Sequence, residues 1–176
     1  MLKEVYFDSM ALYLITGLPG TGKTTVCNEL KARGITAYDG DKDHLAHWYD
    51  KEWRIVRYDG TAEFLRTHER SISREIVERL AQEASDKPVF LCNDPENEVD
   101  LIESFAKIFV LVADKETVQQ RLSARDSGPG HYDWGKLPHE VSYSLDRKVE
   151  TLGRIVLDAT QSPVAIVDKI VASVSI

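Results

Sequence analysis

The segment from Gly17 to Thr24 reads Gly-Leu-Pro-Gly-Thr-Gly-Lys-Thr and has the spacing of a loop that binds phosphate groups. Its glycines let the backbone turn sharply, so that several N–H groups face the same phosphate oxygens. Lys23 adds a positive charge for the β- and γ-phosphates, and the Thr24 hydroxyl can ligate Mg²⁺. The pattern therefore predicts a nucleoside triphosphate site made by Gly17, Leu18, Pro19, Gly20, Thr21, Gly22, Lys23, Thr24 and Thr25.

The residues on either side of this loop supply the elements that would position it. Residues 12–15 form an apolar run typical of a buried strand, and Val26, Cys27 and Leu30 recur on one face of a helix. Gly34 is a suitable residue to end that helix. Strand, loop and helix thus come in the required order, which a glycine-rich turn without a ligand would not explain.

A second candidate group, Asp39-Gly40-Asp41, follows a short strand predicted over residues 35–38. Asp39 could hold Mg²⁺ through water, and Asp41 could take a proton from an attacking hydroxyl group. Asp43, one turn further on, could share either role. The alternative is a solvated turn rich in Asp and Gly.

Three cations late in the chain could serve the same phosphates. Arg121 and Arg125 are four residues apart and would share one face of a helix over residues 115–125, and Lys136 lies in the glycine-rich loop that follows. Phosphoryl transfer spreads charge over oxygens that the planar guanidinium fork can bind. The alternative for the two arginines is a pair of surface ion pairs with nearby carboxylates.

The roles of several other polar and aromatic side chains stay open. Three that could position water, metal or substrate follow a predicted strand over residues 88–92: Asn93, Asp94 and Asn97. An arginine stripe lies within a helix predicted from residue 61 to residue 85, at Arg66, Arg70 and Arg74. Glutamates between these arginines favour a solvated face with salt bridges, and the alternative is that one of the arginines meets an anionic acceptor. Three aromatic side chains suit either packing or a platform for a ligand: Trp48, Trp53 and Tyr58.

The overall composition is that of an ordinary globular protein. The 176 residues are 43% hydrophobic and 29% charged, which fits one domain with a full core. The net charge of −7 argues against a general nucleic-acid or membrane-surface binder. Cys27 and Cys92 lack the spacing of a zinc site and are expected to be reduced core residues. Without an apolar run of about 18 residues or a signal-peptide pattern, a cytoplasmic location is expected.

Strands and helices are predicted to alternate along the chain. Five strands are expected over residues 12–15, 35–38, 88–92, 108–112 and 155–157. Residues 126–137 are predicted to be a loop, a helix is expected over residues 138–152, and Ser162 and Pro163 are expected to start a terminal helix. This order predicts an α/β sandwich with a mostly parallel sheet, whose ligands bind at the carboxyl ends of the strands.

Over residues 11–176 the motif order resembles the P-loop nucleoside and nucleotide kinase group, which includes adenylate, shikimate, gluconate and adenylylsulfate kinases. The resemblance rests on the loop from Gly17 to Thr24, on Asp39 and Asp41, and on Arg121-Leu122 followed by Arg125. A further likeness is to bacterial AAA-type P-loop kinase-like proteins, whose substrate is not assigned. It is carried by the stretch from Cys92 to Glu98 and by Trp134-Gly135-Lys136.

The resemblance implies a P-loop NTPase fold, a three-layer sandwich with a five-stranded parallel sheet in the order 2-3-1-4-5. It implies ATP and Mg²⁺ as ligands, with Thr24 and Asp39 at the metal and a lid at residues 126–137. It also implies that Arg121 packs near the adenine, that Arg125 meets phosphate, and that the adenine is edged by Thr160, Gln161, Ser162 and Pro163. An acceptor-binding segment is expected over residues 42–74.

These observations predict a single-domain kinase that moves the γ-phosphoryl group of ATP to a small-molecule hydroxyl or phosphate. Its catalytic residues would be Lys23, Asp41, Arg125 and Lys136. It would act as a monomer or homodimer, without nucleic-acid or membrane partners. One alternative is a switch ATPase or GTPase that acts on a macromolecule, and another is a nucleotide-binding module without catalysis. The identity of the acceptor stays open.

Overall fold

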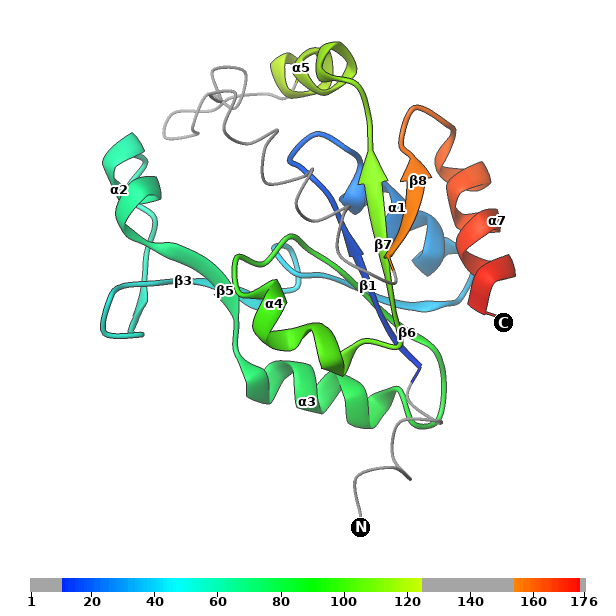
Figure 1. Cartoon of the computed structure of the whole chain (residues 1–176), viewed down its shortest axis with the longest axis horizontal. Coiled ribbons are helices and arrows are strands. Elements are labelled where there is room, and N and C mark those ends of the chain that lie inside the picture. The colour runs from blue at the N-terminus through cyan, green and yellow to red at the C-terminus, as the bar shows by residue number, and fades with distance from the viewer. Residues whose placement is uncertain (1–10, 125–153, 175–176) are drawn as a thin grey trace.

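The central feature of the computed structural model, which describes residues 11–124 and 154–174, is a five-stranded sheet (Figure 1). Its strands are β1 (Leu12–Thr16), β2 (Thr36–Asp39), β6 (Val89–Cys92), β7 (Lys107–Val112) and β8 (Arg154–Asp158). They lie in the order β2-β6-β1-β7-β8, and every neighbouring pair is parallel. Numbered within this sheet the order is 2-3-1-4-5, so the expected fold and strand order are confirmed.

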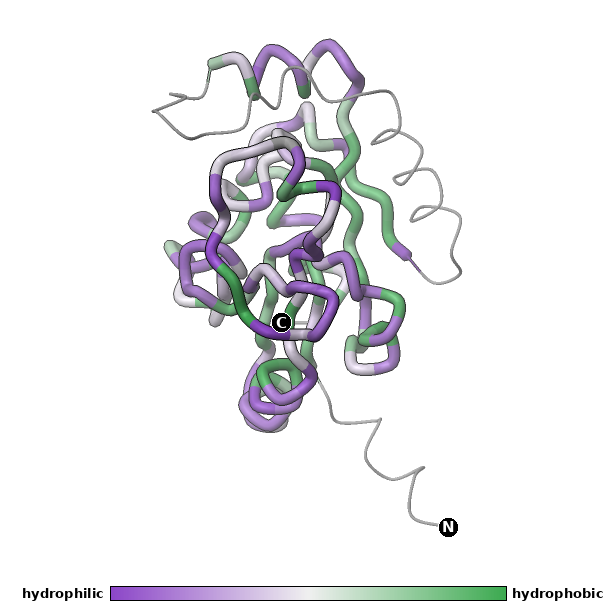
Figure 2. The backbone as a smooth tube through the Cα atoms, turned by 90° about the vertical axis from the view of Figure 1, so that its left-hand side faces the viewer, coloured by the Kyte–Doolittle hydropathy of each residue, from purple (hydrophilic) through white to green (hydrophobic). Residues whose placement is uncertain are grey.

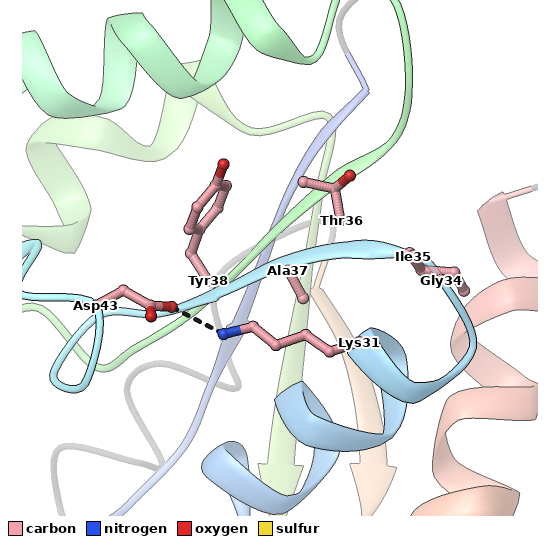
Figure 3. A pocket seen from close by; sticks show the side chains of 7 residues that line it. All are labelled: Lys31, Gly34, Ile35, Thr36, Ala37, Tyr38 and Asp43. Carbon is pink, nitrogen blue, oxygen red and sulfur yellow. Dashed lines mark hydrogen bonds and ion pairs between the residues drawn. The ribbon is translucent and has the colours of Figure 1, made fainter.

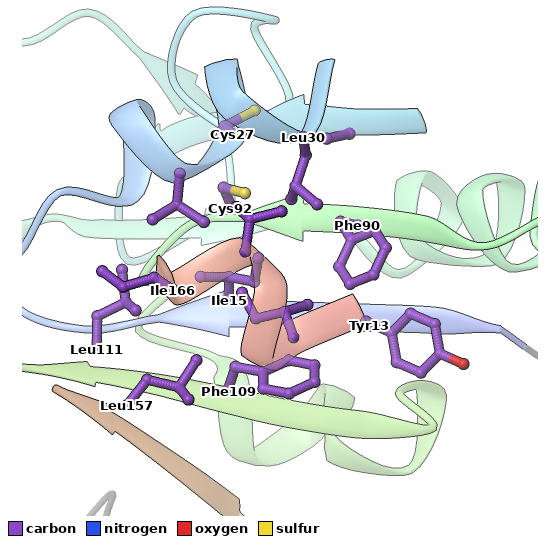
Figure 4. Packing of buried hydrophobic residues seen from close by; sticks show 14 of the residues in the cluster. Tyr13, Ile15, Cys27, Leu30, Phe90, Cys92, Phe109, Leu111, Leu157 and Ile166 are labelled. Atoms are coloured by element: carbon purple, nitrogen blue, oxygen red, sulfur yellow. The ribbon is translucent and has the colours of Figure 1, made fainter. Parts of the chain in front are cut away.

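Helices cover both faces of this sheet because its strands are apolar on both sides. The helices α1 (Lys23–Ala32) and α7 (Pro163–Val174) cover one face, and α3 (Arg74–Glu83), α4 (Glu98–Leu101) and the 3₁₀ turn Ile102–Ser104 cover the other. Side chains alternate along β1, so that Tyr13 and Ile15 pack toward α1 and α7 (Figure 4) while Leu12 and Leu14 pack toward α3. A further helix, α5 (Lys115–Ser123), follows β7 near the phosphate-binding loop.

Hydrophilic segments lie mainly on the outside of the chain trace, around the hydrophobic strands (Figure 2). Within the described ranges, no helix has both the length and the apolar character needed to cross a membrane.

The helix predicted from residue 61 to residue 85 is wrong. The chain instead forms α2 (Ala62–Thr67), the strand β5 (Glu69–Ile72) and then α3. His68 is extended, with φ −128°, and the Ser73 hydroxyl accepts the Ile76 N–H to cap a new helix. Because Ile72 and Ile76 are four residues apart, the apolar spacing resembled that of a single helix.

The interruption has a tertiary cause, because β5 pairs with a strand distant in the chain. A three-stranded antiparallel sheet has the order β4-β3-β5, with β3 at Ala46–Tyr49 and β4 at Ile55–Val56. The Asn97 side chain accepts the N–H of Ile72 at 3.2 Å and donates to its carbonyl oxygen at 2.8 Å. These bonds replace helical ones, and they attach the small sheet to the loop after β6.

The small sheet also changes the interpretation of the arginines and aromatic residues. The three arginines at 66, 70 and 74 belong to α2, β5 and α3 and form no common stripe. Trp48 packs against Tyr58 with ring centroids 5.8 Å apart and against Phe64 at 5.4 Å. These rings give the small sheet, which lies beside α2 in Figure 1, its own apolar contacts.

Candidate functional site

The loop from Gly17 to Lys23 joins β1 to α1 in a conformation that requires glycine. Gly17, Gly20 and Gly22 all have positive φ, at 148°, 89° and 99°. A Cβ on Gly17 would lie 2.6 Å from the carbonyl oxygen of Leu111, so the loop packs closely on the end of β7. By contrast, a Cβ on Gly22 would have no heavy atom of the described residues within 4 Å. Among these residues, the start of α1 is therefore left open, which suits an anionic phosphate.

Lys23 is held over this loop. Its ammonium group donates to the carbonyl oxygens of Gly17 at 2.5 Å and Leu18 at 3.1 Å. The Thr21 hydroxyl also donates to the Leu18 carbonyl oxygen, at 2.8 Å. The positive charge thus lies at the same loop whose N–H groups are expected to bind phosphate.

Thr24 and Asp39, the two predicted metal-binding residues, are in direct contact. The Thr24 hydroxyl donates to Oδ2 of Asp39 at 2.7 Å. Asp39 is only 4% exposed, and its Oδ1 accepts the N–H groups of Asp41 at 3.1 Å and Lys42 at 3.2 Å. The carboxylate is therefore fixed at the start of α1 by the turn that follows β2.

This pair fits the coordination that Mg²⁺ prefers. Among the described residues, no group of three His, Cys, Asp or Glu side chains is placed to hold a metal ion alone. Mg²⁺ in phosphate-transferring sites is usually held by one or two protein oxygens, with substrate phosphates and water as its other ligands. One hydroxyl and one carboxylate beside a phosphate-binding loop are consistent with such a site.

Asp41, the predicted base, lies on the same turn and has two polar neighbours. Its Oδ1 accepts hydrogen bonds from Arg70 Nε at 3.0 Å and Nη2 at 2.5 Å, and from Asn93 Nδ2 at 3.4 Å. The Asp41 side chain is 60% exposed and that of Arg70 is 27% exposed. Sequence reasoning assigned Arg70 to a solvated helix face and so missed this contact, because nothing local indicated that residue 70 lies in a strand.

Gly40 is expected to be intolerant of any side chain. A Cβ there would lie 2.4 Å from Asn93 Nδ2 and 2.6 Å from its Cγ. Gly40→Ala is therefore expected to displace Asn93 and to lower the free energy of unfolding by about 1–3 kcal/mol, as measured by urea denaturation. The double variant Gly40→Ala/Asn93→Ala removes the two closest contacts and leaves the Cβ of residue 93 at 2.8 Å, so it should recover part of this loss. If the losses of unfolding free energy in Gly40→Ala and Asn93→Ala simply add up in the double variant, this packing argument is contradicted.

A pocket of about 330 Å³ lies beside the phosphate-binding loop, between α5, α7 and the end of β8. Seven predicted nucleotide-binding residues line it: Gly20, Thr21, Gly22, Thr25, Arg121, Gln161 and Pro163. Arg121 donates to the carbonyl oxygens of Ala159 at 2.9 Å and Thr21 at 3.5 Å, and these bonds hold its side chain at the pocket. The lining also includes residues that sequence reasoning missed, namely Val26, Ala159 and Ile166.

Two other predicted residues of this group make local bonds and do not line the pocket. The Thr160 N–H and hydroxyl both donate to Asp158 Oδ1, at 2.9 and 2.6 Å. The Ser162 hydroxyl accepts the Ala165 N–H at 3.2 Å and so caps α7, as the sequence predicted. Arg125, Lys136, the predicted lid at residues 126–137 and the helix over 138–152 lie outside the described residues.

A shallow groove beside β2, also of about 330 Å³, is lined by Asp43 but by none of the other predicted site residues (Figure 3). At this groove Lys31 and Asp43 form an ion pair of 3.0 Å, and the hydrogen bond to Asp43 raises the pKa of Lys31. Asp43 Oδ2 also accepts the Asp39 N–H at 2.8 Å. Asp43 thus bonds to Lys31 and the backbone, which gives it a structural role in the turn.

A buried polar network lies at the carboxyl end of β1. The Thr16 hydroxyl lies 3.1 Å from Asp94 Oδ1 and 3.4 Å from Glu98 Oε2. Glu98 also forms an ion pair with Arg154 at 2.6 Å, and the two side chains are 1% and 2% exposed. The network links the strand before the phosphate-binding loop to α4 and β8.

Cys27 and Cys92 are buried free cysteines, as predicted. They lie between α1 and β6 (Figure 4), within the apolar cluster on that face of the sheet. A hydrogen bond with Cys92 lowers the pKa of Cys27, while the same bond and burial raise the pKa of Cys92 well above its usual range.

Comparison with known proteins supports this fold. A family model for the AAA domain matches residues 14–136. A sugar kinase from Janibacter sp. HTCC2649 has a similar structure, with a TM-score of 0.57, 19% identity and 95% of each chain covered. Shikimate kinase from Aquifex aeolicus vf5 has a TM-score of 0.58 and 17% identity, over 93% of this chain and 96% of the other.

A gluconokinase from Sinorhizobium meliloti 1021 is also similar, with a TM-score of 0.52 and 19% identity over 95% of this chain and 93% of the other. At these identities the likeness establishes a common fold. A search of curated proteins finds no significant match to the sequence.

Proposed function

The chain belongs to the AAA domain family, and we propose that it is an ATP-dependent kinase that phosphorylates a hydroxyl or phosphate group of a small molecule. The observation that carries this proposal is the contact of Thr24 with Asp39, at 2.7 Å beside the phosphate-binding loop, with Asp41 on the same turn. The turn after β2 thereby places a candidate base next to a candidate metal-binding pair. The solved structures with this fold include proteins named as sugar kinase, gluconokinase and shikimate kinase.

The proposed division of roles follows from position. Lys23 and the loop N–H groups would bind the β- and γ-phosphates of ATP, and the pocket at Arg121 would take its nucleobase. Thr24 and Asp39 would hold Mg²⁺, which would offset the negative charge of the phosphates. Asp41 would orient the acceptor hydroxyl and accept its proton. Arg125 and Lys136 would supply positive charge to the migrating phosphoryl group.

The test is ATP consumption with and without candidate acceptors. A kinase should be nearly idle with Mg-ATP alone and should turn over when its acceptor is present. A panel of nucleosides, nucleotides, sugar acids and shikimate-like acids, assayed by ADP release and by mass spectrometry of the product, would identify that acceptor. Steady hydrolysis that no small molecule changes would instead support the switch ATPase, and nucleotide binding without any turnover would support a module that has lost catalysis.

The metal-binding role of Asp39 makes a separate prediction. Asp39→Asn is expected to raise the Mg²⁺ concentration needed for half-maximal ATP turnover about 10–100-fold. The reason is that the metal loses the negative charge of the carboxylate that holds it through water. Asparagine can still accept the backbone N–H bonds that Asp39 Oδ1 receives in the turn. Asp43→Asn changes a carboxylate on the same turn that bonds to Lys31, and it should alter the Mg²⁺ requirement far less.

A further inference from the structure

Arg70 is placed on the proposed base by the small antiparallel sheet. Trp48 of β3 and Arg70 of β5 are directly opposite in the strand register, and the guanidinium carbon lies 5.4 Å from the Trp48 ring centroid. The Arg70 backbone is held as well, because its N–H donates to Glu96 Oε1 at 3.1 Å and its carbonyl oxygen accepts the Glu96 N–H at 2.9 Å. The guanidinium is thus pre-oriented at Asp41 by contacts that do not involve Asp41.

The ion pair between Arg70 and Asp41 is of a kind that a ligand can displace. Both nitrogens that donate to Asp41 reach the same oxygen, Oδ1, rather than both carboxylate oxygens in a fork. The Asp41 side chain is 60% exposed, and ion pairs in contact with water contribute only about 0–1 kcal/mol. A bound anion could therefore take over the guanidinium at little energetic cost.

A second observation points to a ligand at the same place. Asn93 is 4% exposed, and within the described part of the chain its Oδ1 has no hydrogen-bond partner. Its Nδ2 faces Asp41 Oδ1 at 3.4 Å. If the Asn93 amide were flipped, so that its oxygen and nitrogen changed places, two oxygens would face each other. A buried carbonyl oxygen without a donor is costly, and a hydroxyl group would supply that donor.

We infer that Arg70 is the anion-binding residue of the acceptor site, and that it leaves Asp41 when a hydroxylated anion, a carboxylate or a phosphate monoester, occupies this site. This inference rests on the proposed function of the same site. Arg70 moves to the acceptor anion, and the acceptor hydroxyl lies between Asp41 and Asn93. The acceptor oxygen then bonds to the γ-phosphorus as the bond from that phosphorus to the bridging oxygen breaks. The hydroxyl proton passes to Asp41, and ADP leaves with the bond's electron pair.

The inference explains why the base is paired before the acceptor arrives. While two nitrogens of Arg70 and the Nδ2 of Asn93 donate to Asp41 Oδ1, that oxygen is occupied and is not offered to a water molecule, so ATP alone would be hydrolysed slowly. Only an acceptor that offers Arg70 another negative charge releases the carboxylate. Acceptor recognition and activation of the base would then be one event.

The experiment measures binding by calorimetry for anions matched with neutral counterparts. The pairs are gluconate with glucose, shikimate with its methyl ester, and adenosine monophosphate with adenosine. Each is titrated into the wild type, Arg70→Gln, Arg70→Lys and Arg33→Gln in the presence of Mg²⁺ and a non-hydrolysable ATP analogue. Arg33 is the matched control, because it is paired with Asp168 at 2.6 Å and its side chain is 27% exposed, as is that of Arg70.

At least one anion is expected to bind the wild type and Arg33→Gln about 10–100-fold more tightly than its neutral counterpart. Arg70→Gln should abolish that preference, and Arg70→Lys should keep part of it. Asp41→Asn should strengthen binding of the same anion about twofold to fivefold, because the competing carboxylate is neutral. Circular dichroism and binding of the ATP analogue check that each variant is folded.

Two results would overturn the inference: anions that bind no more tightly than their counterparts, or a preference that survives in Arg70→Gln. Transfer from ATP to a neutral acceptor at a rate that Arg70→Gln does not change would also overturn it, while leaving the kinase proposal intact. Conversely, anion binding that depends on Arg70 without transfer from ATP would support the inference and contradict the kinase proposal.

Discussion

Replacing Asp41 with asparagine is expected to lower the rate of acceptor phosphorylation about 10²–10⁴-fold, the usual contribution of a general base. Asparagine has nearly the same shape but cannot take the proton from the acceptor hydroxyl. Asp41 lies outside the phosphate-binding loop and the nucleotide pocket, so the Kd for ATP should stay near that of the wild type. The measurement is kcat for phosphoryl transfer, together with the Kd for ATP from calorimetry.

The control for this variant is Asp168→Asn. Asp168 is paired with Arg33 at 2.6 Å and its side chain is 63% exposed, close to the 60% of Asp41. It therefore tests the loss of an exposed carboxylate from an arginine pair at another place in the fold. Its turnover should match the wild type. If Asp41→Asn also kept full acceptor-dependent turnover, Asp41 would not be the base.

Replacing Glu98 with glutamine is expected to destabilise the protein by about 3–5 kcal/mol, because it removes the carboxylate that pairs with the buried charge of Arg154 among the described residues. The two side chains are 1% and 2% exposed and their ion-pair distance is 2.6 Å. Two guanidinium nitrogens of Arg154, Nε and Nη1, already have no hydrogen-bond partner within the described ranges. Glu98 is thus the group that offsets the cost of burying this charge.

Urea denaturation monitored by circular dichroism measures this effect as a change in the free energy of unfolding. Glu63→Gln is the control, since it breaks an exposed pair with Arg66 in which both side chains are 70% exposed. That change should cost about 0–1 kcal/mol. The double variant Glu98→Leu/Arg154→Met removes both buried charges and should recover most of the loss. A loss of unfolding free energy below about 1 kcal/mol in Glu98→Gln would show that the pair of Glu98 and Arg154 contributes little to stability.

The phosphate-binding loop could be predicted in detail because its determinants are local. The positive φ values of Gly17, Gly20 and Gly22 are conformations that glycine adopts readily, and Lys23 and Thr24 follow at fixed offsets. The strands of the large sheet were also recognisable, because a strand buried on both faces is a continuous apolar run. Their order within the sheet was an expectation from family resemblance, and the structure confirms it.

The prediction failed where pairing between distant segments outweighs local spacing. Ile72 and Ile76 have helical spacing, yet the N–H and carbonyl groups of Ile72 bond to the Asn97 side chain, 25 residues away. Arg70 reaches Asp41 across 29 residues, and that contact exists only because residues 69–72 form a strand opposite β3. No local pattern encodes either contact.

The sequence by itself determined the ligand class of this protein, because binding phosphate requires only a short loop, a lysine, a hydroxyl and a helix start, all contiguous in the chain. It also indicated that Asp39 and Asp41 follow a strand whose carboxyl end faces the ligand. Only the tertiary structure decided which groups surround Asp41. Arg70 and Asn93 contact Asp41, and Trp48 packs against Arg70. The three residues come from separate strands or strand ends, and their meeting depends on sheet register and burial. Such contacts join distant segments, and the spacing of residues along one segment does not predict them.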